Sequence, residues 1–88
     1  MKAQREPVEQ LLKTTKGQIE GVLRMIDDDR YCIDISNQIL ACEALLRKAN
    51  KIVLKGHLTH CVKETFLSGQ NEQEKIDEIM NVLEKMNK

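Results

Sequence analysis

The chain has 88 residues, 14 basic and 14 acidic side chains, and 41% hydrophobic residues with only one tyrosine and one phenylalanine. This length is enough for one domain, residues 1–88, and excludes two separate cores. The sequence shows no signal peptide and no span long and apolar enough for a membrane, so we expect a cytoplasmic protein with reduced thiols. Three cysteines, an odd number for a disulfide framework, favour metal binding or thiol chemistry.

The charges are unevenly distributed although they sum to zero. Residues 1–26 carry five basic and three acidic side chains, residues 32–66 carry five and three, and residues 67–88 carry three and five. The first two segments are therefore basic and the last is acidic. In an oligomer the basic segments can gather on one face, which leaves nucleic-acid binding open.

The first predicted helix begins near Pro7, a residue suited to an early helical position, and runs to Ile26. Its apolar side is formed by residues that recur every three or four positions: Val8, Leu11, Leu12, Thr15, Ile19, Val22 and Ile26. The segment DDDR at 27–30 interrupts this pattern. It predicts a turn that can also cap the following helix.

The second predicted helix is long, from about Tyr31 to Phe66. Its apolar seam alternates spacings of four and three and comprises Ile35, Ile39, Cys42, Leu46, Ala49, Val53 and Gly56 or His57. The segment LSGQNE at 67–72 predicts a loop with Gly69 as the helix stop. A third helix follows, with Ile76, Ile79, Met80, Leu83 and Met86 on its apolar side.

The predicted fold is all-α, with three helices and one long central helix. At about 1.5 Å per residue the central seam is roughly 50 Å long, more than two short companions can cover. We therefore expect the long helix to pack against its copy in an antiparallel helical-bundle dimer.

The segment GHLTHC contains half of a metal site. His57 and Cys61 are four residues apart, which puts them on one helical face. Cys32 lies on the same helix but twenty-nine residues before Cys61, or roughly 43 Å along its axis. In an antiparallel dimer Cys32 of one subunit would face His57 and Cys61 of its partner, so the site would be completed across the interface.

Two thiolates and one imidazole suit Cu(I), whereas Zn(II) would prefer a fourth ligand, which Cys42 or His60 would have to supply. Cys42 lies on the apolar seam and is better interpreted as a small hydrophobic residue. His60 points about 100° away from Cys61 and is better interpreted as a surface or interface residue. The four methionines are interpreted as core residues or the chain start.

Three segments, KGQIEGVLRMIDDDRYC, ILACEALLRKAN and GHLTHCV, resemble the copper-sensitive operon repressor (CsoR/RcnR) family of bacterial regulators. The similarity extends over nearly the whole chain. It implies an all-helical protein whose dimers pair into a tetramer, which binds operator double-stranded DNA without a helix-turn-helix and releases it when a ligand binds between subunits.

The resemblance also implies the ligand set. Copper sensors of the family have Cys, His and Cys where this chain has Cys32, His57 and Cys61, which makes Cu(I) the expected effector. Tyr31 matches a neighbouring residue of copper members. A glutamate on the third helix links the copper site to DNA in those members, and here Asp77 and Glu78 are the two candidates. Thr14 stands where an arginine is common.

The predicted DNA-binding residues are basic side chains on the first two helices, in a pattern that indicates contacts to phosphates and DNA shape. They are Lys13, Lys16, Arg24, Arg47, Lys48 and Lys51, with Lys55 in the same cluster on the second helix. A solvated charged face is the alternative interpretation of such a pattern.

Three other functions would use some of the same residues. An enzyme with Cys61 as nucleophile and His57 as base lacks an oxyanion loop and the bulk for a substrate pocket, so no enzymatic activity is predicted. A copper chaperone would use the same ligands but has no need of basic faces. A persulfide-sensing repressor of the same family, using Cys32 and Cys61, is the main alternative.

Overall fold

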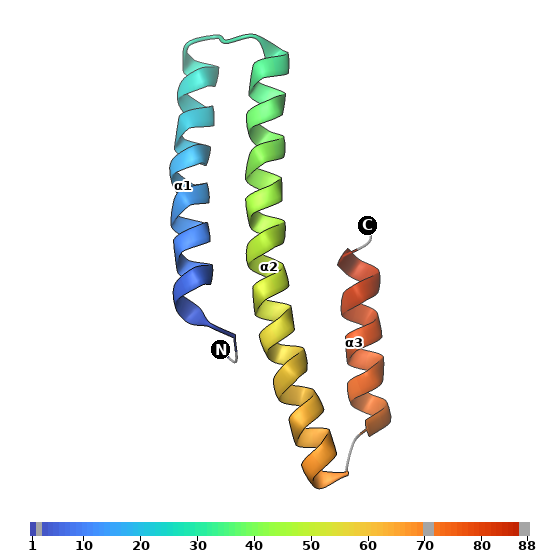
Figure 1. Cartoon of the computed structure of the whole chain (residues 1–88). Helices are drawn as coiled ribbons and strands as arrows, with labels where there is room; N and C mark the ends of the chain where they lie inside the picture. The colour runs from blue at the N-terminus through green and yellow to red at the C-terminus, as the bar shows by residue number, and fades with distance from the viewer. Residues whose placement is uncertain (2, 70–71, 87–88) are drawn as a thin grey trace.

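In the computed structural model the described residues are residue 1, residues 3–69 and residues 72–86, without the side chains of residues 66 and 68. They form three helices and no strand: α1 Arg5–Asp27, α2 Cys32–Ser68 and α3 Glu72–Met86 (Figure 1). The prediction of an all-α fold with one long central helix is therefore confirmed. None of the described helices is long and apolar enough to cross a membrane.

The ends of α1 differ in part from the prediction. The helix begins at Arg5, two residues before the predicted start at Pro7, and a proline fits there because the first backbone N–H groups of a helix have no intrahelical acceptor. At the other end the N–H of Arg30 donates to the Met25 carbonyl at 2.9 Å and that of Asp29 to the Ile26 carbonyl at 3.0 Å. With Asp29 at φ 54°, this is a Schellman ending.

The segment DDDR therefore ends α1 and does not cap α2. The N-cap of α2 is Tyr31, and no side chain accepts a capping hydrogen bond there, so the predicted capping role is wrong. Asp29 instead adopts the αL conformation that closes α1. Aspartate tolerates this conformation better than most residues.

The α1–α2 hairpin packs through small and medium side chains at heptad spacing. Val8, Thr15 and Val22 are the buried residues of α1, and Cys42 and Ala49 are buried on the facing part of α2. Thr15 satisfies its hydroxyl locally by donating to the Leu11 carbonyl at 2.7 Å. The short side chains allow the two helices to lie close together over the whole length of α1.

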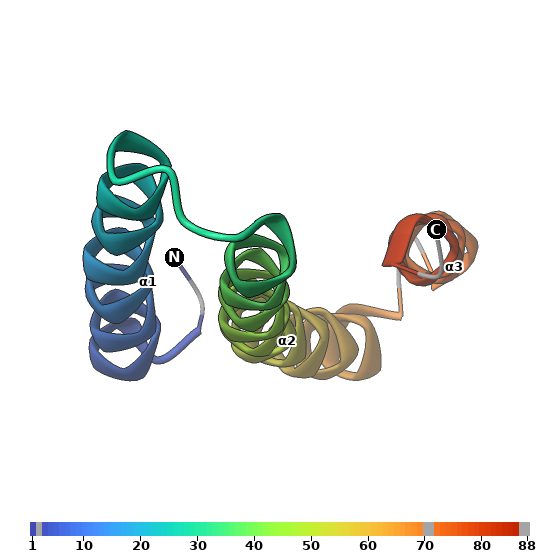
Figure 2. The ribbon, with the colours of Figure 1, turned by 90° about the horizontal axis from the view of Figure 1, so that it is seen from above.

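Gly69 reverses the chain after α2. It adopts φ 64°, and its N–H donates to the Thr65 carbonyl at 2.7 Å, so the predicted glycine stop is confirmed. Residues 70 and 71 of the predicted loop lie outside the described residues. The α3 helix runs back beside the second half of α2, on the side opposite α1, and contacts it over a shorter stretch (Figures 1 and 2).

The chain is a single layer of helices. Viewed from above, α1, α2 and α3 form one row (Figure 2), and the extents of the molecule are 57 × 27 × 12 Å. A helix with its side chains is about 10–12 Å across, so the thin dimension is one helix. Such a layer has no interior: among the described residues only Val8, Thr15, Val22, Cys42, Ala49 and Cys61 are buried.

Apolar rows therefore remain exposed on the layer. On α1, Leu12, Ile19 and Ile26 repeat every seven residues beside the buried row and are 45–54% exposed. On α2, Ile39 and Leu46 belong to the predicted seam but are 45% and 44% exposed. The α1 helix covers only part of the seam, in agreement with the expectation that one chain cannot bury it.

The N-terminal segment lies against α2 at Gly56. A Cβ added to Gly56 would clash with the backbone of Ala3 and would lie 2.7 Å from the Ala3 Cβ. Glycine is thus required at this position by the close approach of residues before α1, one residue away from His57.

This approach predicts different effects of alanine at two helical glycines. Gly17→Ala meets nothing within 4 Å and should raise the free energy of unfolding by about 0.5–1 kcal/mol, because alanine favours helix over glycine. Gly56→Ala should not raise the free energy of unfolding in this way, because its new Cβ must displace Ala3. Thermal unfolding and amide hydrogen exchange at Ala3 and Gln4 measure both effects, and unchanged exchange in Gly56→Ala would contradict the contact.

Candidate metal centre

The structure brings His57 and Cys61 together on α2. Their spacing of four residues puts the Cys61 Sγ 3.4 Å from the His57 Nε2. Cys61 is a free thiol with only 3% of its surface exposed, and the His57 side chain is 40% exposed. A soft sulfur donor and an imidazole thus lie side by side near the surface, in agreement with the predicted half-site.

Glu78 of α3 contacts the same imidazole ring. Its Oε1 is 2.8 Å from the His57 Nε2, and its Oε2 is 3.8 Å from the Lys75 Nζ. The hydrogen bond with His57 lowers the pKa of the Glu78 carboxyl, partial desolvation opposes this, and the Lys75 ammonium adds to the lowering. Glu78 therefore stays ionised to a lower pH than an ordinary glutamate.

Of the two acidic candidates on α3, the structure shows Glu78 in contact with the half-site and Asp77 in contact with its own helix. Asp77 faces its own helix, where its Oδ1 accepts a hydrogen bond from the Gln73 Nε2 at 3.0 Å. Glu78 reaches His57 across the gap between the helices. The sequence leaves this choice open because the spacing of residues on α3 does not fix its rotation relative to α2.

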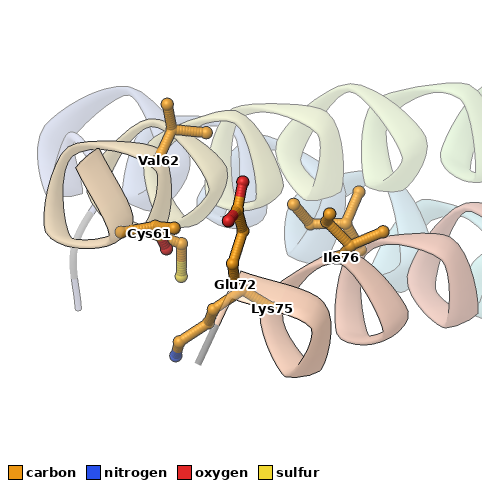
Figure 3. A pocket seen from close by; sticks show the side chains of 7 residues that line it. Cys61, Val62, Glu72, Lys75 and Ile76 are labelled. Atoms are coloured by element: carbon orange, nitrogen blue, oxygen red, sulfur yellow. The ribbon is translucent and has the colours of Figure 1, made fainter. Parts of the chain in front are cut away.

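A cavity of about 430 Å³ adjoins the half-site between α2 and α3. Figure 3 shows the Cys61 sulfur directed into this space, with Glu72 and Lys75 projecting from the first turns of α3. The rest of the lining is mainly apolar and comprises Val62, Thr65, Ile76 and Ile79. Sequence reasoning missed this cavity, because it is formed by two helices whose apolar faces meet only partly.

Cys32 and Tyr31 are at the other end of α2. Both are exposed beside the α1–α2 turn, as is expected from the roughly 43 Å of helix between Cys32 and Cys61. No group of three His, Cys, Asp or Glu side chains suited to a metal ion occurs within the described part of one chain. A single chain thus presents a two-donor half-site and a distant thiol.

The two remaining polar candidates point away from the half-site. Cys42 is 6% exposed inside the hairpin, with its Sγ 3.9 Å from the Gln18 Oε1, which agrees with its interpretation as a small core residue. The His60 Nε2 lies 3.4 Å from the Glu64 Oε1 and faces the N-terminal segment.

All six predicted DNA-binding side chains are exposed. Because Gln18 contacts Cys42 across the antiparallel hairpin, Lys13 and Lys16 lie at about the level of Arg47 and its neighbours on α2. Arg24 is eight residues beyond Lys16, or about 12 Å nearer the turn. The structure thus places most of the basic candidates at similar levels along the hairpin and Arg24 nearer the turn.

Comparison with known proteins gives the family. Residues 4–85 match the family described as metal-sensitive transcriptional repressor. The chain belongs to this family. The family is one of transcriptional repressors and not of enzymes, so the predictions of a repressor family and of no enzymatic activity are confirmed.

Two relatives of the family are named copper-sensing transcriptional repressor CsoR. The protein of Bacillus subtilis (strain 168) is 35% identical over 97% of this chain and 83% of its own length. That of Mycobacterium ulcerans (strain Agy99) is 36% identical over 82% of this chain, and the match spans only 61% of the relative. The chain thus corresponds to about three fifths of the mycobacterial protein.

Two solved structures share the fold of this metal-sensitive repressor. The copper-sensing repressor CsoR with Cu(I) from Geobacillus thermodenitrificans NG80-2 superposes with a TM-score of 0.81 and 40% identity, over 94% of this chain and 85% of that one. The nickel-responsive regulator InrS gives a TM-score of 0.82 over 98% and 96% of the two chains. At 22% identity InrS supports the fold alone.

The His57–Glu78 contact predicts a measurable pKa difference. The pKa of the Glu78 carboxyl is lower in the folded protein than its ordinary value of 4.5. Ionised Glu78 therefore stabilises the docking of α3 at pH values above 4.5, and this contribution is lost as the pH falls through the lowered pKa. In His57→Ala the pKa of Glu78 should rise toward 4.5, whereas His60→Ala should leave it unchanged because His60 pairs with Glu64. Carboxyl titration by nuclear magnetic resonance on the metal-free protein measures both, and equal values in the two variants would contradict the assignment.

Proposed function

We propose that this protein is a transcriptional repressor that binds Cu(I) at a site shared between subunits and releases operator DNA on binding. The observation that carries the proposal is the junction of the His57 imidazole, the Cys61 thiol and the Glu78 carboxylate. It puts a soft sulfur donor, an imidazole donor and a carboxylate partner for the imidazole at the contact between α2 and α3.

The donor set fits Cu(I). Two thiolates and one imidazole form a sulfur-rich, low-coordinate set of the kind that Cu(I) prefers, and the three residues would be Cys32, His57 and Cys61. Cu(I) would supply a positive charge and strong bonds to sulfur, which hold together residues from separate elements. The CsoR relatives and the Cu(I)-bound structure of similar fold support copper over the other effectors of the family.

Glu78 would orient the imidazole. A metal-bound histidine usually donates its other ring N–H to a carboxylate or carbonyl, which fixes the tautomer. If the N–H is on Nε2 and is donated to Glu78, the lone pair is on Nδ1, and Nδ1 would be the metal-binding nitrogen once the ring turns it toward Cys61, which now lies 3.4 Å from Nε2. Tyr31 would approach the same site together with Cys32, its neighbour in sequence. Asp77 has a partner on its own helix and has no role in this proposal.

The shared site follows from the shape of the chain. Cys61 and His57 are at one end of α2 and Cys32 is exposed at the other, so within one helix they cannot meet. An antiparallel partner would bring them together, and it would also cover the exposed rows of α1 and α2. We propose a dimer built this way and, by its resemblance to the family, a tetramer of two dimers in the cytoplasm.

DNA would bind to the basic stretch of the hairpin. Lys13 and Lys16 on α1 lie level with the basic residues of α2, and Arg47, Lys48 and Lys51 precede the half-site by two to three turns. Because α2 carries both the metal donors and these side chains, a change at His57 and Cys61 can reach the DNA face through a single rigid helix. Arg24, nearer the turn, would contact DNA separately or not at all.

Mixed dimers test whether the site is shared. A chain with Cys32→Ala paired with a chain with Cys61→Ala leaves one intact shared site and one site that lacks both thiols. The expected result is one tight Cu(I) per mixed dimer. If both ligands came from one chain, neither subunit would retain a complete site, and the measured stoichiometry would be zero.

His57→Ala tests copper as the effector. Loss of the imidazole removes one of three donors, so this variant should bind Cu(I) more weakly and keep its DNA when Cu(I) is added. Sulfur transfer needs only the thiols, and a persulfide would therefore act on wild type and variant alike. DNA release is measured with Cu(I) and with an organic persulfide in parallel. Wild-type protein that ignores Cu(I) but leaves DNA on persulfide treatment would establish the persulfide-sensing alternative.

A further inference from the structure

A second hollow lies on α2, next to the N-terminal segment. It has a volume of about 440 Å³ and is lined by Ala3, Gln4, Ile52, Lys55, Gly56, Thr59, His60 and Lys63. The segment before α1 forms one wall, and it can approach so closely only because Gly56 lacks a side chain. We call this hollow the N-terminal groove.

The N-terminal groove is cationic. Lys55 and Lys63 are eight residues apart, so they stand about 12 Å apart along α2 with Thr59 midway. His60 lies between them and pairs with Glu64. Among the described residues that line the groove, none is an aspartate or glutamate. A solvated lysine face has no walls, whereas this groove has a backbone segment on one side and a helix on the other.

The groove also continues the predicted DNA face. Lys48, Lys51 and Lys55 follow one another at helical spacings of three and four residues, and Lys63 extends the same side by two turns. From Lys48 to Lys63 the helix rises about 22 Å, the length of roughly six base pairs at 3.4 Å each. A row of this length can follow the backbone of a duplex.

We propose that the N-terminal groove takes a backbone phosphate of duplex DNA between Lys55 and Lys63, and so extends the DNA face to the end of α2. The inference rests on the proposed function and adds to it Lys63 and a phosphate site in which Lys55 takes part. Gly56, Thr59 and His60 of the groove share two helical turns with His57 and Cys61, which lie on the other side of α2. A shift of those turns on metal binding would therefore move the phosphate site directly.

The test compares salt dependence of binding to promoter duplex for wild type, Lys55→Gln/Lys63→Gln and a control, Lys85→Gln, in the last turn of α3. Removing one phosphate contact reduces the magnitude of the slope of log affinity against log salt concentration by about 0.9. Between 50 and 200 mM salt, the variant should therefore lose affinity by a factor about three to four times smaller than the factor for wild type. The groove variant should show this change and the control should not. Circular dichroism confirms that all the variants fold.

Arg47→Ala/Lys48→Ala separates the groove from the proposed function. If that variant flattens the slope and Lys55→Gln/Lys63→Gln does not, the groove is excluded while DNA binding by the hairpin stands. If wild-type protein shows no salt-dependent DNA binding, both proposals fail. If both variants flatten the slope, the groove belongs to the DNA face.

Amide resonances of Thr59 and His60 identify the anion. They should shift with a short duplex at concentrations where the same amount of inorganic phosphate has no effect. Equal shifts with duplex and with free phosphate would show a general anion site and overturn DNA as its occupant.

Discussion

A thickness of one helix is the constraint on which the rest of this structure depends. A layer of about 12 Å cannot enclose side chains, so α1 and α2 bury one row between them and leave a parallel row, Leu12, Ile19 and Ile26 on α1, facing solvent. The same geometry explains the incomplete metal site. A metal ligand set needs donors from several directions, whereas a single row of helices offers Cys61 and His57 from one side only. Exposed apolar rows and an unfinished donor set thus have one cause, and a second copy of the chain would resolve both.

The length of α2 allows it to contact different elements at its two ends. Over Cys42 and Ala49 its buried side faces α1, and beyond Gly56 the buried residue among the described side chains is Cys61, which faces α3. The change occurs beyond the level at which α1 begins, where Ala3 lies against Gly56. His57 is next to that point, so the half-site lies on the same part of α2 as the N-terminal groove and the docking of α3, which together extend from Ile52 to Thr65. A change on one side of this part of α2 would therefore have only the width of one helix to cross to reach the other side.

Local spacing predicts the helices and the His57–Cys61 pair because both depend only on the helical repeat. It predicts the turn at DDDR but not its use: the αL residue Asp29 closes α1 there, and no side chain caps α2. Local spacing does not predict which residues of two helices contact each other. Neither the choice of Glu78 over Asp77 nor the cavity beside Cys61 follows from the sequence, because the rotation of α3 about its axis is set by packing across a short connection. The close approach of Ala3 to Gly56 is likewise visible only in three dimensions.

The attachment of α3 is the most readily changed contact in the chain. Its face toward α2 is small, Met80 is 59% exposed, and the one described hydrogen bond that joins the two helices is between Glu78 and His57. An exposed polar contact contributes little to stability because water competes for both groups and salt screens them. The Nε2 of His57 lies within reach of both the Glu78 carboxylate and the Cys61 thiol, so a reorientation of the ring changes both contacts at once. A site of this kind would suit a sensor better than a structural metal centre, because a ligand that changed the His57 ring would also change the contact that holds α3.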